Sequence, residues 1–121
     1  MASTIFERCG GFATVRKVVS AFYDRILDSR DLQKYFVEVD MRALIDHQTK
    51  FIAYVMGGPT SIPDDVLRRA HASLAISHAD FEEMGRLLKE TLEDFSLEPG
   101  DIAHIMQEVR RREPLVVTRH D

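Results

Sequence analysis

The sequence contains no tryptophan, one cysteine and no long run of apolar residues. A single cysteine forms neither a disulfide within the chain nor a paired thiolate site for a metal. Because no apolar stretch approaches the roughly 18–20 residues that cross a bilayer, we expect no membrane span. The first residues lack the basic and apolar regions of a secretory signal peptide, so we expect a cytoplasmic protein.

Charge is also modest, because 16 Lys and Arg residues against 20 Asp and Glu residues give a formal net charge of −4. A mildly acidic chain is poorly suited to nonspecific nucleic-acid binding, so we expect no nucleic-acid partner. The 121 residues contain no internal repeat and no long linker, which predicts a single domain over 1–121 and a monomer. We expect the ends, 1–4 and 115–121, to be loose.

Apolar residues recur at helical spacing, and Gly and Pro stand between the periodic segments. No segment alternates like a half-buried strand, so the sequence predicts an all-α fold. The expected helices cover 13–28, 41–57, 64–71, 77–95 and 99–113, with a short turn at 31–36. Asp40 is the expected N-cap of the second helix, and residues 77–80 resemble a capping box. The basic run 110–112 is expected to be a solvated helix end.

Polar residues interrupt the apolar faces of three helices: Tyr23, the pair His47 and Gln48, and His71. Taken singly, each is typical of a hydrogen-bonded core residue or of a side chain whose polar tip reaches solvent. A buried polar group without a partner costs about 1–3 kcal/mol. Because a chain of this length has a small core, several such groups suggest one ligand that they share.

The candidate ligands differ in the donors they require. His47 and His71 with Asp46 or Asp80 make only a partial zinc set, and Asp46 lies off the helix face that carries His47. Cys9 has no neighbouring His and is interpreted as an apolar filler rather than a nucleophile. Haem requires one axial His, a flat apolar slot and a polar distal side, which these residues supply.

Five motifs follow one another in a fixed order between Ile5 and Val109. They occupy 5–11, 22–27, 35–41, 47–59 and 69–81. In order and spacing they resemble the motifs of the group I truncated haemoglobins. Groups II and III of that family carry a Trp in the helix after the proximal segment, where this chain has Met84. The missing tryptophan therefore favours group I.

The resemblance implies a truncated globin fold, a two-over-two α-helical sandwich around haem b. It implies His71 as the proximal iron ligand, with Tyr23 and Gln48 as distal, catalytic donors to iron-bound O2, NO or CO. Arg68 is a candidate partner of a haem propionate, with a solvated surface position as the alternative. Further haem contacts are implied at Phe22, Phe36, Leu44, Phe51, Ile52, Leu67, Ile76 and Phe81.

Two expectations concern how the haem is held. Some members of the family bond a C-terminal His to a haem vinyl group, but the matching positions here are Leu115 and Val116. His104 and His120 miss that position, so we expect noncovalent haem. His47 either ligates the iron opposite His71, giving a six-coordinate resting state, or bonds a haem propionate at the mouth of the pocket.

Three functions are compatible with these residues. The first is a haem protein for oxygen storage or transport, or for NO dioxygenation with electrons from an external reductase. The second is a haem-based redox or gas sensor, or an electron-transfer module, that acts through a partner. The third is a helical structural domain without a cofactor. The pocket residues are the same for the first two, so the sequence leaves them open.

Overall fold

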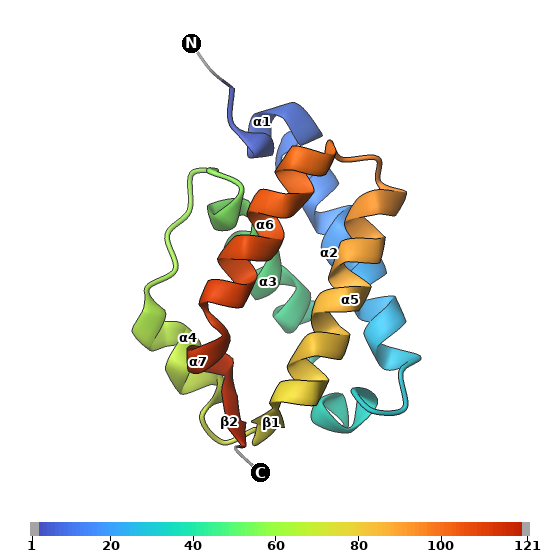
Figure 1. Cartoon of the computed structure of the whole chain (residues 1–121), viewed down its shortest axis with the longest axis vertical. Helices are drawn as coiled ribbons and strands as arrows, with labels where there is room; N and C mark the ends of the chain where they lie inside the picture. The colour runs from blue at the N-terminus through green and yellow to red at the C-terminus, as the bar shows by residue number, and fades with distance from the viewer. Residues whose placement is uncertain (1–2, 120–121) are drawn as a thin grey trace.

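The computed structural model describes residues 3–119 and is mostly helical (Figure 1). Its elements are α1 (Ile5–Cys9), α2 (Gly11–Leu27), the 3-10 helix η1 (Gln33–Phe36), α3 (Met41–Val55), α4 (Asp64–His71), β1 (Ile76–Ser77), α5 (His78–Asp94), α6 (Pro99–Arg111), α7 (Glu113–Val116) and β2 (Val117–Arg119). The predicted all-α class is confirmed. None of the described helices is both long and apolar enough to cross a membrane.

The four long helices form two packed pairs. Helix α2 packs on α3, α5 packs on α6, and the second pair lies across the first (Figure 1). Their apolar faces meet in one core in which Val15, Val18, Ile26, Leu92 and Ile105 are fully buried. This arrangement is the two-over-two sandwich that the resemblance implies. The shorter elements η1, α4 and α7 close the lower part of the molecule.

Side-chain caps fix where the helices begin. The Asp40 carboxylate accepts from the Ala43 N–H at 3.2 Å, and the Ser77 hydroxyl accepts from the Asp80 N–H at 3.1 Å. Ser77 is thus an N-cap as predicted, but the second half of the expected capping box is absent from the described residues. The Asp80 carboxylate instead accepts a hydrogen bond from Tyr35, so it does not return to the backbone of Ser77.

The chain ends are more ordered than the sequence predicts. Thr4, expected to be loose, caps α1 by accepting from the Glu7 N–H at 3.0 Å, while its own N–H donates to the Glu7 carboxylate. Residues 115–119 were expected to be loose as well, and that expectation is wrong. They continue into α7 and β2, where Val116 and Val117 are each only 6% exposed.

A two-stranded parallel pairing holds this C-terminal segment. Ile76 of β1 lies opposite Val117 of β2, and the pairing brings the end of the chain beside the start of α5. Strands of two and three residues show no alternation long enough to detect in the sequence. The burial of apolar side chains and the pairing of backbone groups explain why the segment is ordered. His120 lies outside the described residues.

Candidate functional site

A mostly apolar cavity lies between α2, α3, α4 and α5, with a volume of about 1180 Å³ including its open mouth. Side chains that the sequence and the resemblance singled out meet in its walls. These are Phe22, Tyr23, Phe36, Leu44, Gln48, Phe51, Ile52, Leu67, His71, Ile76 and Phe81. They come from six different elements, so only the folded chain brings them together.

His71 stands at the end of α4 with its ring fixed by a backbone group. Its Nδ1 lies 2.8 Å from the carbonyl oxygen of Leu67, one helical turn earlier. A carbonyl only accepts hydrogen bonds, so Nδ1 must carry the proton, and Nε2 then keeps its lone pair. This arrangement is typical of a histidine that binds a metal through Nε2, because the bond from Nδ1 to a backbone carbonyl holds the ring in orientation.

Tyr23 and Gln48 bring polar groups to the cavity from α2 and α3. Tyr23 is 6% exposed, and its ring packs edge-on against Phe22 at 5.0 Å and Phe36 at 5.7 Å between ring centres. Burial raises the pKa of Tyr23, so the phenol stays protonated and remains a hydrogen-bond donor. Within residues 3–119, neither the Tyr23 hydroxyl nor the Gln48 amide has a hydrogen-bond partner. Both are therefore available to a ligand.

Two of the candidate residues lie outside the cavity wall. His47 is exposed on α3, and Arg68 is exposed on α4. His47 nevertheless lies three residues after Leu44 and four before Phe51, both of which line the cavity. Residues at these spacings are neighbours on a helix surface, so the backbone of His47 lies along the cavity-facing stripe.

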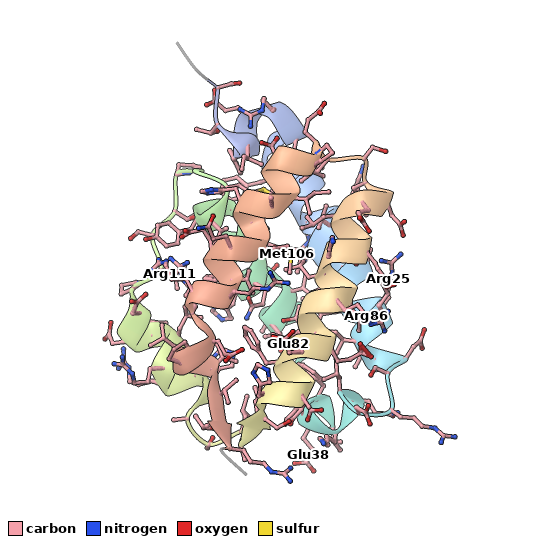
Figure 2. All side chains as sticks on the ribbon, in the orientation of Figure 1. Arg25, Glu38, Glu82, Arg86, Met106 and Arg111 are labelled. Atoms are coloured by element: carbon pink, nitrogen blue, oxygen red, sulfur yellow. The ribbon has the colours of Figure 1, made fainter. Side chains whose placement is uncertain are left out.

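The partial zinc set considered from the sequence is not assembled. Asp46 is paired with Arg16 on the surface, and Asp80 bonds to Tyr35. Within the described part of the chain, the potential metal-ligand cluster is His78, Glu82 and Glu113. It lies at the surface near the start of α5 (Figure 2, Glu82) and contributes no side chain to the cavity wall.

A polar cluster at the edge of the cavity was missed by sequence reasoning. The Tyr35 hydroxyl donates to the Asp80 carboxylate at 2.5 Å, and the Lys34 ammonium lies 3.2 Å from the same carboxylate. Burial opposes ionisation of Asp80, but these hydrogen bonds outweigh it and lower its pKa. Burial, followed by the bond to Asp80, raises the pKa of Tyr35 to about 12. The cluster ties η1, which carries Phe36, to α5.

Arg112 was assigned to a solvated helix end from the sequence, and this assignment is wrong. Its neighbours Arg110 and Arg111 are exposed as expected for a solvated helix end (Figure 2, Arg111). Arg112 is only 5% exposed and lines the cavity. Successive residues turn by about 100° around a helix, so one member of a basic run can face inward while the others face solvent. Nothing in the run itself distinguishes which member does so.

The chemistry of the cavity fits haem. Its wall is mostly apolar, His71 has an oriented ring with a free Nε2, and the Tyr23 and Gln48 donors in the wall lack partners among the described residues. His71 would hold the iron, and the aromatic and aliphatic side chains would contact the porphyrin. Polar and charged side chains in the wall would contact the haem propionates and the small molecules bound at the iron.

Comparison with known proteins agrees with this geometry. The chain matches the bacterial-like globin family model over residues 4–117. It is 30% identical to the group 1 truncated haemoglobin GlbN of Synechocystis over 107 residues, which cover 85% of this chain and 86% of that protein.

Solved structures match the fold over nearly the whole chain. The truncated haemoglobin of Tetrahymena pyriformis in its Fe(III) form superposes with a TM-score of 0.87 at 21% identity, covering 97% of this chain and 100% of that one. The 2/2 haemoglobin of a Synechococcus species, solved in the cyanomet state with covalently attached haem, superposes with a TM-score of 0.84 at 26% identity, covering 94% and 98%. By its family match, its relatives and its fold, the chain belongs to the globins and, within them, to the group I truncated haemoglobins.

Proposed function

We propose that this globin binds O2, NO and CO at the ferrous iron of noncovalently held haem b, with His71 as the iron ligand. The observation that carries the proposal is the pairing of one oriented imidazole with two unpartnered donors in one apolar cavity. Haem supplies gas binding and one-electron redox chemistry at its iron. The protein supplies orientation through Leu67, exclusion of water by apolar side chains, and hydrogen bonds from Tyr23 and Gln48.

The hydrogen bonds favour dioxygen for an electrostatic reason. O2 gains partial negative charge at a ferrous haem iron, so it would accept hydrogen bonds from the Tyr23 hydroxyl and the Gln48 amide. Such a charge-assisted bond contributes about 1.5–3 kcal/mol. The raised pKa of Tyr23 keeps the donor proton in place. Both donors are held by helices of the sandwich, which limits the reorganisation needed when the ligand binds.

The residues at the C-terminal wall support the proposal of noncovalent attachment. Val116 lines the cavity, and neither Val116 nor Leu115 carries a nucleophile that adds to a vinyl group. His104 lies exposed on α6, away from the cavity wall.

NO dioxygenation is the activity that we propose for the oxygenated protein. The haem iron, when bound, would supply one electron for the conversion of NO and O2 to nitrate, and it would be ferric afterwards. An external reductase must return that electron, so the reaction needs a partner. Tyr23 and Gln48 would hold O2 by hydrogen bonds until NO arrives.

Stopped-flow mixing of the oxygenated protein with NO tests this activity. We expect one nitrate for each haem and conversion to the ferric spectrum within the mixing time. The CO-bound protein is the matched control, because it lacks the oxygen needed for nitrate. Nitrate formation no faster than in buffer would contradict the dioxygenase proposal and favour the sensor or electron-transfer function.

We further propose a six-coordinate resting state in which His47 ligates the iron opposite His71. His47 is exposed, but it lies between Leu44 and Phe51 on the cavity-facing stripe of α3. A rotation of its side chain therefore brings the imidazole toward the cavity, and α3 itself need not move. Incoming ligands bind only the open fraction, so the state lowers their apparent affinity by that fraction.

The optical spectrum of the ligand-free ferrous protein tests the role of His47. We expect sharp, split low-spin bands that change to one broad high-spin band in His47→Leu, and faster CO binding in that variant. His78→Leu removes an exposed imidazole elsewhere and serves as the control. A broad high-spin band in the unmodified protein would instead support the propionate role of His47.

A further inference from the structure

Arg112 is a buried cation in an otherwise mostly apolar cavity wall. It ends α6, and its guanidinium lies 5.7 Å from the Phe51 ring centre and 5.8 Å from the Tyr54 ring centre. Its Nη1 donates to the Glu108 carbonyl at 2.8 Å and to the Glu108 carboxylate at 3.0 Å. Only 5% of the residue is exposed.

One buried donor of this guanidinium has no hydrogen-bond partner in the described part of the chain. The Arg112 Nε is the single buried side-chain nitrogen or oxygen in residues 3–119 that has no hydrogen-bond partner. Arginine does not lose its proton in proteins, so the group cannot avoid the cost of burial by becoming neutral. Native proteins leave few buried donors unsatisfied, and an exception indicates a role or an absent partner.

None of the described contacts of Arg112 with the protein uses its Nε–H. The rings of Phe51 and Tyr54 engage the flat face of the guanidinium, and Glu108 engages Nη1. The Nε–H lies in the plane of the group, so it neither faces the two rings nor donates to Glu108. Arg112 also lines the cavity, so a molecule bound there can complete the group once a rotation of the side chain turns the buried Nε–H toward it.

We propose that Arg112 is an anion-binding residue of the cavity, which takes an oxyanion with two oxygens in one plane, such as a carboxylate or nitrate. Arg presents Nε–H and Nη–H side by side, and this fork matches such an anion. Haem is one source, since it carries two carboxylates on an apolar body. A free small anion beside the haem is the other source. The inference rests on the proposed haem function, and the exposed Arg68 is not needed for it.

The first arm of the test compares haem with haem dimethyl ester, in which both carboxylates are blocked. Apoprotein is titrated with each, and Soret absorbance gives the two affinities. If Arg112 binds a haem carboxylate, the preference for haem over its ester falls about 10- to 100-fold in Arg112→Met. Arg111→Met removes an exposed cation from the same Glu108 and should keep the preference.

The second arm titrates the ferric haem-loaded protein with nitrate and follows the haem absorbance. If the anion is free, nitrate changes the spectrum of the unmodified protein at lower concentration than that of Arg112→Met, while the ester preference is unchanged. Either result supports the proposal and identifies the source. Equal ester preference and equal nitrate response in the unmodified protein and Arg112→Met would overturn it.

Two further measurements separate the role of Arg112 from a loss of fold and from a failure of the proposed haem function. Helical circular dichroism of the apoprotein shows whether Arg112→Met folds, and Arg112→Gln, which keeps a donor but no charge, replaces it if helicity is lost. The haem affinity of the unmodified protein tests the proposed function separately. If that protein binds no haem, the function fails, whereas normal haem binding with no effect at Arg112 contradicts only the anion site.

Discussion

Replacing His71 by leucine should abolish tight haem binding. His71 is the imidazole in the described cavity wall, and the Leu67 carbonyl fixes its ring with Nε2 free. Removing only an outer-shell partner of a metal ligand costs about 10- to 100-fold in affinity, so loss of the ligand itself should cost at least about 100-fold. The measurement is haem titration of the apoprotein followed by Soret absorbance.

Controls separate the loss of the ligand from a loss of fold. His104→Leu removes an exposed imidazole from α6 and should bind haem like the unmodified protein. His71→Gly leaves space in which added imidazole should restore the Soret band. If His71→Leu binds haem as tightly as the unmodified protein, His71 is not the proximal ligand.

Replacing Tyr23 by phenylalanine should speed O2 dissociation about 10- to 100-fold, because one charge-assisted hydrogen bond is lost. The substitution deletes only the hydroxyl, so the packing of the ring against Phe22 and Phe36 is retained. Stopped-flow displacement of O2 by CO gives the rate. CO bound to the iron carries less charge, so its own dissociation should change far less.

The pKa of Tyr23 adds a second expectation to this experiment. Since burial raises that pKa, the phenol keeps its proton, and O2 dissociation should be independent of its ionisation up to about pH 10. Gln48→Leu, which removes the other donor from the cavity, provides the comparison. Equal O2 dissociation in Tyr23→Phe and the unmodified protein would show that Tyr23 does not hold the ligand.

Local signals in the sequence predicted α2 to α6 well but missed the short helices α1 and α7. The apolar stripe of α2, with Val15, Val18 and Ile26, repeats at helical spacing because that face is buried against the rest of the sandwich. Asp40 and Ser77 mark two helix starts because their side chains accept backbone N–H groups within three residues. Such interactions are local, so a single sequence contains the residues needed to predict them.

Contacts between distant segments were not predictable in this way. Tyr35 and Asp80 are 45 residues apart, and no spacing rule connects them. The order of residues 115–119 depends on the pairing of Val117 with Ile76 across the chain. Arg112 could not be told from Arg110 and Arg111, because which of them faces inward depends on how α6 is rotated in the sandwich.

The sequence by itself determined the helical class, most helix boundaries and the polar residues that interrupt apolar faces, since these depend on spacing along one helix. Only the tertiary structure decided which of those residues share a cavity. It brought Tyr23, Gln48 and His71 to one cavity and left His47 and Arg68 exposed. It also buried a cation that the sequence assigned to solvent, because side-chain environment is set by the packing of helices against each other.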